Sequence, residues 1–315
     1  VDFTEVKGQY LAKKALEIAA AGGHNCLLVG SPGVGKTMLA KRFRTILPDM
    51  DFEESINVTK IYSVAGILSE NLIQERPYRE PHHSITKTGL IGGGSVPKPG
   101  EISLAHLGVL YLDELLEFKT DILELLRKPS EEKSICINRL KISVKYPCNF
   151  ILIASTNPCP CGYYGSNIKK CTCTEYQRRK YISKLSGPLK DRFDMQINVY
   201  YTKNIEILNQ KNETSSVIRE RVIKANQIQK ERYKKESIKS NSELTPDLIR
   251  KYCKLNKDRL DILNKTYSKL KLSMRAYYKI IKVARTIADL EGCQDINENH
   301  ILGAIHCRSK DKNEL

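Results

Sequence analysis

The chain has 315 residues, of which 41% are hydrophobic and 28% are charged, and this composition excludes a protein that is disordered throughout. The length is enough for two domains, each with a core of its own. Lys and Arg outnumber Asp and Glu by 52 to 36, and the formal net charge of +16 favours a polyanionic partner such as DNA or RNA, although basic residues that only solvate helix faces give the same excess.

The N-terminus has no signal-peptide pattern, and no apolar run approaches the roughly 20 residues that a membrane-spanning helix needs. We therefore expect a cytoplasmic protein without a membrane partner. The sequence begins at Val1 rather than Met, so we also expect that a further segment precedes it.

The first strong motif is a phosphate-binding loop, Gly-Ser-Pro-Gly-Val-Gly-Lys-Thr at residues 30–37. It follows the apolar run Cys26–Val29 and precedes a helix-forming stretch at 38–47, which is the strand, loop and helix order that such a motif requires. Backbone N–H groups and the helix N-terminus would bind phosphates, Lys36 would reach the β- and γ-phosphates, and Thr37 would hold Mg²⁺. The predicted ATP-binding residues are Gly30, Ser31, Pro32, Gly33, Val34, Gly35, Lys36, Thr37 and Met38.

A second apolar run, Val109–Leu112, is followed directly by Asp113 and Glu114. A buried strand that ends in two acids suits the metal side of the same site, because ligands collect at the carboxyl ends of parallel strands. We expect Asp113 to hold Mg²⁺ and Glu114 to polarise the attacking water.

The segment 133–146 alternates with a period of two around a polar break at residues 138 and 139, which predicts a β-hairpin. A third apolar run, Phe150–Ser155, then leads to Asn157, whose amide would orient the attacking water or contact the γ-phosphate. An Asn that only caps a turn before the following proline is the alternative.

Four cysteines lie within 15 residues, as two Cys-x-Cys pairs. Four thiolates suit a tetrahedral structural Zn²⁺ ion. The spacing is tighter than the usual Cys-x₂₋₄-Cys, so redox-labile thiols or a disulfide remain alternatives. The candidate zinc ligands are Cys159, Cys161, Cys171 and Cys173.

The pattern of the chain changes near residue 200. Before it, short apolar runs alternate with helical patterns, which predicts an α/β domain with a parallel sheet and flanking helices. After it, long Lys-rich helical segments at 213–236, 245–255 and 275–290 predict a smaller all-helical domain. We expect domains at residues 1–200 and 201–315. In the last segment the apolar residues share one helical face, and the polar residues Lys279, Lys282 and Arg285 lie elsewhere.

Taken together, the phosphate loop, the Asp-Glu strand and the Asn strand resemble those of AAA+ ATPases of the magnesium-chelatase-like ComM/YifB group, and the resemblance covers nearly the whole chain. It implies an AAA+ P-loop core followed by a helical lid domain. Further segments that carry it are Arg-Pro-Tyr-Arg-Glu-Pro-His-His at 76–83, Gly-Gly-Gly at 92–94, Pro-Gly-Glu-Ile-Ser-Leu-Ala-His at 99–106, Asn-Pro-Cys-Pro-Cys-Gly at 157–162 and Ser-Gly-Pro-Leu-Lys-Asp-Arg-Phe-Asp at 186–194.

The resemblance also implies roles for two arginines. Arg192 matches the arginine finger, which reaches the nucleotide of the neighbouring subunit, although an ion pair with Asp191 or Asp194 is the alternative. Arg275 matches the sensor-2 arginine of the lid, with Arg285 as the fallback. A finger that acts on a neighbour requires a ring, and the group assembles as hexamers.

In related ring helicases a hairpin at this place projects into the central pore. By that resemblance Arg139, Lys141 and Lys145 would contact the phosphates of DNA, whereas an edge hairpin with solvated lysines is the alternative.

The function that this resemblance implies is an ATP-hydrolysing ring motor that acts on single-stranded or branched DNA, with helicase or branch-migration activity in recombination. Two alternatives remain: a magnesium-chelatase motor subunit that drives Mg²⁺ insertion into a porphyrin, and a nucleotide-gated regulatory or assembly module. The resemblance also implies a Lon-like domain upstream of these 315 residues.

Overall fold

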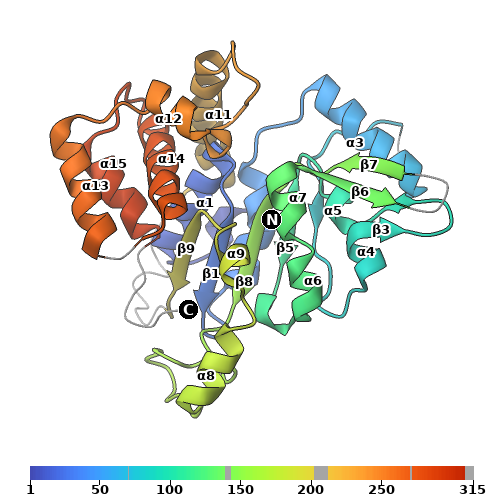
Figure 1. The fold of residues 1–315 in the computed structure, drawn as a ribbon, viewed down its shortest axis with the longest axis horizontal. Coiled ribbons are helices and arrows are strands. Elements are labelled where there is room, and N and C mark those ends of the chain that lie inside the picture. Colours follow the sequence, from blue (N-terminus) through green and yellow to red (C-terminus); the bar gives the residue numbers. More distant parts are fainter. Residues whose placement is uncertain (70, 139–142, 202–211, 270–271, 309–315) are drawn as a thin grey trace.

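A five-stranded sheet lies at the centre of the computed structural model, which describes residues 1–69, 71–138, 143–201, 212–269 and 272–308 (Figure 1). The strand order is β2-β5-β8-β1-β9, and all neighbouring strands are parallel. The strands are β1 (Cys26–Gly30), β2 (Tyr78–Arg79), β5 (Val109–Leu112), β8 (Ile151–Thr156) and β9 (Met195–Val199).

The sequence predicts three of these strands, β1, β5 and β8, to within one residue at each end. They occupy the middle of the sheet and are buried on both faces, so each consists mainly of a run of apolar residues. The two strands that it misses are at the edges. β9 alternates buried and half-buried residues, and β2 has only two residues, so neither gives a strong apolar signal.

Helices cover both faces of the sheet, and the two faces belong to two separate hydrophobic clusters. Successive side chains of a strand point to opposite faces, so Cys26 and Leu28 enter one cluster while Leu27 and Val29 enter the other. The helices of this part of the chain are α1 (Tyr10–Gly22), α2 (Lys36–Phe43), α3 (Phe52–Ala65), α4 (Lys87–Ile91), α5 (Glu101–Leu104), α6 (Thr120–Glu124), α7 (Arg127–Glu132), α8 (Glu175–Ile182) and α9 (Gly187–Lys190), with short 3₁₀ turns at Phe3–Glu5, Arg44–Ile46 and Leu115–Glu117.

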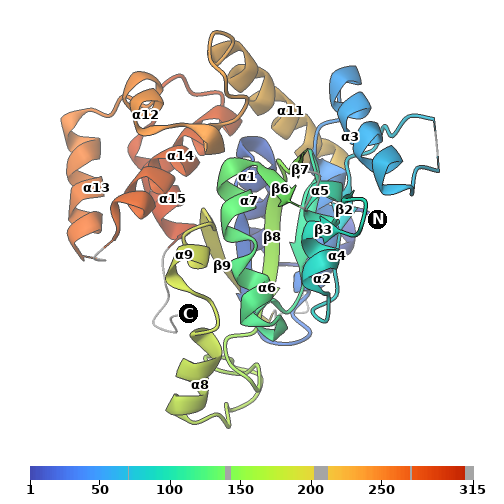
Figure 2. The same ribbon diagram turned by 45° about the vertical axis from the view of Figure 1, so that its right-hand side comes forward.

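The later part of the chain is helical and packs beside the sheet (Figures 1 and 2). Buried residues of α11, α14 and α15 belong to the same cluster as those of α1 and β1, so the helical region shares its core with one face of the sheet. The predicted boundary between residues 200 and 201 adjoins residues 202–211, which lie outside the described part, and it stays a prediction. The elements are α11 (Ser215–Arg232), a 3₁₀ turn at Asn241–Glu243, α12 (Pro246–Tyr252), α13 (Lys257–Lys269), α14 (Met274–Leu290) and α15 (Glu298–His306).

Two small antiparallel ribbons lie at the side of the sheet away from the helical region (Figure 1). One pairs β3 (Gly92–Gly93) with β4 (Lys98–Pro99), and the other is the predicted hairpin, β6 (Ser134–Asn138) with β7 (Ser143–Pro147). The two touch: the Tyr146 hydroxyl donates a hydrogen bond of 2.7 Å to the carbonyl oxygen of Pro97. The hairpin is therefore held at its base by the first ribbon.

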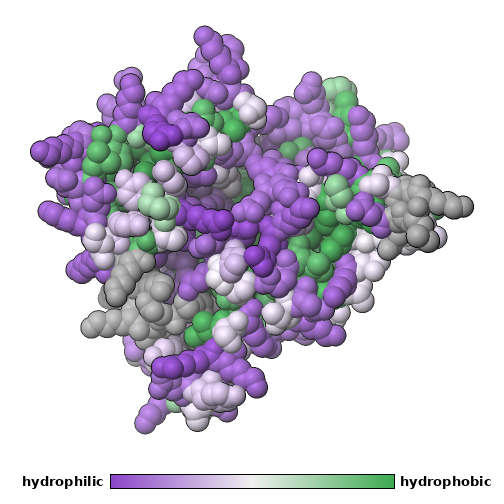
Figure 3. Space-filling model, in the orientation of Figure 1, coloured by the Kyte–Doolittle hydropathy of each residue, from purple (hydrophilic) through white to green (hydrophobic). Residues whose placement is uncertain are grey.

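The face of the molecule shown in Figure 3 is mainly hydrophilic, with smaller hydrophobic areas. Within the described ranges, no helix combines the length and the apolar composition that crossing a bilayer requires.

Candidate nucleotide site

The phosphate loop connects β1 to α2 and depends on its glycines. Gly33 and Gly35 have φ angles of +78° and +93°, in the left-handed region that side chains with a Cβ rarely adopt, and Gly35 caps the N-terminus of α2. A Cβ at Gly30 would overlap the carbonyl oxygen of Val199 on the neighbouring strand. The loop thus follows a path that favours glycine at these positions, and α2 points its free N–H groups toward it.

Lys36 is buried at the first position of α2, and its ammonium group donates three hydrogen bonds. The acceptors are the carbonyl oxygens of Gly30 at 2.6 Å and Ser31 at 2.9 Å, and the Asn157 side-chain oxygen at 3.0 Å. Burial lowers the pKa of Lys36 to about 8, an effect that the nearby carboxylates of Asp113 and Glu114 oppose. Lys36 and Asn157, predicted for one site, are therefore in direct contact.

Asp113 is tied to the phosphate loop through Thr37, whose hydroxyl donates to Asp113 Oδ2 at 3.0 Å. Its Oδ1 accepts hydrogen bonds from the Tyr111 hydroxyl at 2.8 Å and from the Ser155 hydroxyl. Burial raises the pKa of Asp113, but the hydrogen bonds from Ser155, Tyr111 and Thr37 outweigh it, so the pKa is below its ordinary value. A hydroxyl beside an ionised carboxylate offers the hard oxygen ligands that Mg²⁺ prefers.

Sequence reasoning did not identify Tyr111 and Ser155 as partners of Asp113. Each is a polar side chain in a buried and mainly apolar strand, β5 for Tyr111 and β8 for Ser155. A buried hydroxyl needs a hydrogen-bond partner, and this requirement could have indicated that Tyr111 and Ser155 contact a polar group such as Asp113.

Glu114 follows Asp113 at the end of β5 and has an unusual backbone. Its φ is +50° and ψ +50°, a left-handed conformation that is uncommon for a residue other than glycine. Its N–H donates to Asp113 Oδ1 at 3.1 Å, and its side chain is exposed beside the site. Such outliers concentrate at functional sites, where the surrounding structure holds them in place.

Arg192 lies near the amino-terminal ends of the strands, whereas the phosphate loop lies at their carboxyl-terminal ends. These two sides of the sheet are called its amino edge and its carboxyl edge below. Asn25, just before β1, donates its side-chain amide to the Arg192 carbonyl oxygen at 3.0 Å, whereas the phosphate loop begins where β1 ends. Five strand residues span about 13 Å. The Arg192 guanidinium pairs with Glu131 at 2.7 Å and not with Asp191 or Asp194, the alternatives considered from the sequence.

Arg275 lies in the first turn of α14 and is 62% exposed, with its guanidinium 3.8 Å from Asp191 Oδ2. It lines the same cavity as Arg192, of about 580 Å³, at the amino-terminal edge of the sheet. Lys279, one turn further along α14, donates to the Phe193 carbonyl oxygen at 3.0 Å, so the segment after Arg192 is attached to this helix.

The prediction that Arg285 lies away from the apolar face of α14 is wrong. Arg285 is 2% exposed, and its guanidinium donates to the carbonyl oxygens of Cys293 and Gln294 and pairs with Asp289 at 3.1 Å. The aliphatic part of an arginine packs among apolar residues when a buried carboxylate and carbonyls take up its donors. These partners of Arg285 all lie within the helical region. Of the two arginines considered for the lid, Arg275 lines the cavity that Arg192 also lines, and Arg285 does not.

Two of the three predicted DNA-contacting residues, Arg139 and Lys141, lie outside the described residues. The third, Lys145, is exposed on β7 and lies opposite Cys136 in the hairpin.

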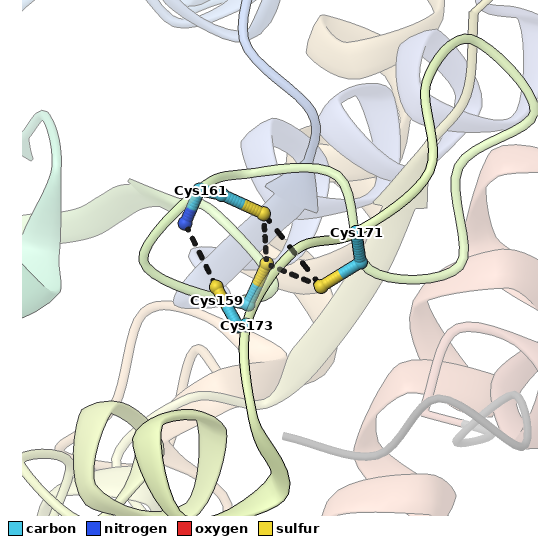
Figure 4. A group of neighbouring side chains, drawn as sticks. All are labelled: Cys159, Cys161, Cys171 and Cys173. Carbon is cyan, nitrogen blue, oxygen red and sulfur yellow. Dashed lines mark hydrogen bonds between the residues drawn. The ribbon is translucent and has the colours of Figure 1, made fainter.

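The four clustered cysteines converge in the connection between β8 and α8 (Figure 4). Their sulfur atoms all lie within 4.8 Å of one another, and the Cys159–Cys161, Cys161–Cys171 and Cys159–Cys171 separations are 3.4, 3.6 and 3.8 Å. A zinc ion with Zn–S bonds of about 2.3 Å requires sulfur–sulfur edges of about 3.8 Å. All ten thiols of the chain are free, so the structure has no disulfide here.

The protein environment already favours ionisation of one of these thiols. Burial opposes ionisation of Cys161, but hydrogen bonds from the backbone N–H groups of Tyr163 and Thr172 and from neighbouring thiols outweigh it and lower the pKa to about 5. The fourth sulfur, of Cys173, accepts a hydrogen bond of 3.3 Å from the Cys161 N–H. The donor set is one of closely grouped sulfurs, as a structural zinc site requires.

Comparison with known proteins gives one consistent family. Residues 2–207 match the family described as magnesium chelatase, subunit ChlI, and residues 212–308 match the C-terminal part of the same subunit. The chain is 44% identical over 312 residues to the competence protein ComM of Haemophilus influenzae and 42% identical over 318 residues to YifB of Escherichia coli. These matches cover 98% and 99% of the chain but 60% and 61% of the relatives, so the chain spans about three fifths of their length.

A more distant match, 27% identical over 174 residues, is the 38 kDa magnesium-chelatase subunit of Rhodobacter capsulatus, and it covers 50% of each chain. The family matches agree with the parallel sheet, the phosphate loop and the helical C-terminal region described above. The chain therefore belongs to the magnesium-chelatase-like AAA+ ATPases of the ComM/YifB group.

Proposed function

We propose that the chain is the ATP-hydrolysing subunit of a ring motor that acts on DNA, with helicase or branch-migration activity in recombination. One observation carries the proposal. Two hydrogen-bonded pairs, Lys36 with Asn157 and Thr37 with Asp113, lie next to each other at the carboxyl edge of the sheet, while Arg192 lies at the amino edge. The first group suits one half of a hydrolytic site, and the arginine suits the other half in a neighbouring subunit.

In the proposed site the chain's own groups bind and orient ATP. Lys36 would exchange its bonds with the loop carbonyls for bonds with the β- and γ-phosphates, and Thr37 and Asp113 would hold Mg²⁺. That ion supplies positive charge that offsets the charge of the phosphates. Glu114 would accept the proton of the attacking water, and Asn157 would orient that water.

The proposed assembly follows from the positions of the two arginines. Neither Arg192 nor Arg275 is at the carboxyl edge, so a single chain does not complete its own site. A head-to-tail ring brings the amino edge of one subunit to the carboxyl edge of the next. We propose a hexamer, the ring size that the family resemblance implies, in which Arg192 stabilises charge on the neighbour's γ-phosphate.

DNA is the proposed substrate of the motor. The net charge of +16 supports a polyanionic partner, and the hairpin β6–β7 offers the exposed Lys145 for phosphate contacts. The relative from Haemophilus influenzae is named a competence protein, which agrees with a role in handling DNA. We further propose that the protein works in the cytoplasm, where its ten thiols stay reduced.

We also propose that the four clustered cysteines hold one structural Zn²⁺ ion. The support is the grouping of the four sulfurs at separations close to the edges of a zinc–thiolate tetrahedron. Metal analysis of the purified chain tests this proposal, with one zinc per chain expected and none in a variant that lacks two of the thiols.

A second candidate function is that of a magnesium-chelatase motor subunit, favoured by the match to the Rhodobacter capsulatus subunit over half of the chain. In that case ATP turnover would not depend on nucleic acid. A third, the nucleotide-gated module, would bind ATP without needing the acid at Glu114.

Steady-state ATPase activity, measured across protein concentration with and without single-stranded and branched DNA at two salt concentrations, separates these functions. Turnover that rises with protein concentration, is stimulated by DNA and is weakened by salt supports the DNA motor. Concentration-dependent turnover that ignores DNA supports the chelatase-like motor instead. Glu114→Gln should bind ATP and lose turnover, and Glu53→Gln, an exposed glutamate in the first turn of α3, is the matched control.

A further inference from the structure

The four-cysteine loop, residues 157–174 between β8 and α8, packs directly on the phosphate loop. Gly162, next to Cys161, has a φ of +84°, and a Cβ placed on it would lie 2.5 Å and 2.7 Å from the Cδ and Cγ atoms of Pro32. Pro32 is the third residue of the phosphate-loop motif. The backbone of the four-cysteine loop therefore rests against the ring of Pro32 with no room for a side chain between them.

A second contact joins the same two loops. Asn157, the first residue of the four-cysteine loop, accepts the hydrogen bond from Lys36, and the Cβ position of Gly162 is 3.8 Å from the Asn157 side-chain carbon. The two contacts lie side by side and reach different parts of the phosphate loop, Pro32 near its start and Lys36 near its end. The four-cysteine loop thus contacts both parts of the phosphate loop.

Few other interactions define the conformation of the four-cysteine loop. It contains no helix or strand, and its middle residues, 165 to 170, are exposed or half-buried. Outside the thiol cluster, Arg178 of α8 holds the loop through two contacts. Its Cζ atom lies 4.4 Å from the centre of the Tyr164 ring, and its guanidinium donates a hydrogen bond of 2.8 Å to the Cys173 carbonyl oxygen. The sulfurs are the place where the two arms of the loop, residues 159–161 and 171–173, meet (Figure 4).

We infer that zinc bound by the four cysteines holds Gly162 and Asn157 against the phosphate loop, and that zinc occupancy thereby sets the affinity of that loop for ATP. This inference rests on the proposed zinc site and the proposed ATP site. Zinc–thiolate bonds cross-link the two arms, so the loop keeps one position against Pro32. Without the ion the two arms separate and the phosphate loop loses its contact with Gly162 and Asn157. ATP binding must then also order the phosphate loop, which reduces the free energy of binding.

The experiment measures zinc content and nucleotide affinity on the same samples of the full chain. Zinc is measured by atomic emission, and affinity is measured from the fluorescence polarisation of a labelled ATP analogue with Mg²⁺. The wild type should carry one zinc ion, and Cys171→Ser/Cys173→Ser should carry none and bind the analogue at least tenfold more weakly. Removing zinc from the wild type with a chelator should have the same effect, and adding zinc sulfate should reverse it.

Gly162→Ala separates the contact with Pro32 from zinc binding itself. This variant should keep its zinc and still bind the analogue about tenfold more weakly, because the added methyl group displaces Pro32. Gly292→Ala is the matched control, since Gly292 also has a positive φ, +68°, but has no atom within 4 Å of its Cβ position. It should bind the analogue as the wild type does, and thermal unfolding identifies any variant that is simply misfolded.

The outcomes distinguish the three claims. A wild type that binds no nucleotide overturns the proposed ATP site, and a wild type without zinc overturns the proposed zinc site; either result removes this inference as well. A wild type that carries zinc and binds ATP equally well after zinc removal and with Gly162→Ala overturns the inference alone.

Discussion

The ammonium group of Lys36 donates a hydrogen bond of 3.0 Å to the side-chain oxygen of Asn157. This bond joins the start of α2 to the end of β8, two elements that are more than 100 residues apart in the sequence. It places a neutral amide beside the cation that, in the proposed site, would hold the γ-phosphate, and there the amide would contact a phosphate oxygen or the attacking water.

Asn157→Ala should lower kcat for ATP hydrolysis by about 100-fold, the typical loss when one oriented hydrogen-bonding group is removed from a reacting centre. The dissociation constant for ATP should change much less, because Lys36 keeps its charge. Turnover and analogue binding, measured side by side, check this. Asn299→Ala, at an exposed position of α15, is the control. An equal loss in binding and turnover would show that Asn157 only supports the loop.

The lowered pKa of Lys36 predicts that ATP binding depends on pH. Above about pH 8 the ammonium loses its proton, and binding of phosphates must then be coupled to proton uptake. The dissociation constant should be flat between pH 6.5 and 8 and then rise, by at most about tenfold per pH unit. Calorimetry in two buffers with different ionisation enthalpies measures the proton uptake directly.

Lys36→Arg provides the control for this pH dependence, because a guanidinium does not titrate in this range. It should bind ATP more weakly but with a flat pH profile. A wild-type profile that is flat up to pH 9.5, without proton uptake, would contradict the prediction.

Arg192 should act on the neighbouring subunit, and mixing experiments test this. Lys36→Ala and Arg192→Ala should each be inactive alone. In a one-to-one mixture about a quarter of the interfaces of a randomly assembled ring have both residues intact, so about a quarter of the wild-type turnover should return. The control mixture pairs Lys36→Ala with the Lys36→Ala/Arg192→Ala double variant, which forms no complete site. If the first mixture stays as inactive as the control, Arg192 does not work in this way.

The sequence was sufficient to predict the carboxyl edge of the sheet, because adjacency follows from a simple rule. Residues that come directly after apolar parallel strands meet at one edge, as Asp113 and Asn157 do after β5 and β8. The phosphate loop that follows β1 brings Thr37 to Asp113 and Lys36 to Asn157. It was not sufficient for pairings that depend on strand order and register. Tyr111 and Ser155 converge on Asp113 only because β5 lies next to β8, and nothing in the sequence sets that order.

The same limit applies to Arg192, Arg285 and Pro32. The ion pair of Arg192 with Glu131 depends on the way that α7 packs beside the segment after α9, and the contact of Gly162 with Pro32 depends on the path of a loop without regular structure. Helical periodicity groups Arg285 with the other polar residues of α14. Periodicity alone does not show that the buried carboxylate of Asp289 pairs with Arg285.

Asp289 should be essential for the stability of the helical region. It is fully buried and accepts hydrogen bonds from Arg232, Arg285 and Asn241. Asp289→Ala leaves buried cations without their partner and should lower the free energy of unfolding by about 3–5 kcal/mol. Urea unfolding measures this, with the exposed Asp295→Ala as control. A loss below about 1 kcal/mol would mean that the network relaxes around the missing carboxylate.

Lys145 should contribute to DNA binding without affecting the basal ATPase rate. Lys145→Glu should weaken DNA stimulation and reduce the slope of log affinity against log salt by roughly one. Lys224→Glu, an exposed lysine of α11, makes the same charge change away from the hairpin and should leave the slope unchanged. Equal effects of the two variants would indicate a response to net charge alone.

If Arg192 completes the site of a neighbouring subunit, as proposed, its separation from the phosphate loop across the length of β1 also constrains how copies of the chain can associate. A two-fold dimer pairs each surface with its equivalent, so it cannot complete both sites when their halves lie on opposite edges. Head-to-tail addition leaves one unmatched half at each end, and an open row of subunits therefore has one complete site fewer than it has subunits. Only a closed ring gives every subunit a complete site. The turnover per subunit should therefore be higher in a closed ring than in an open row of the same number of subunits.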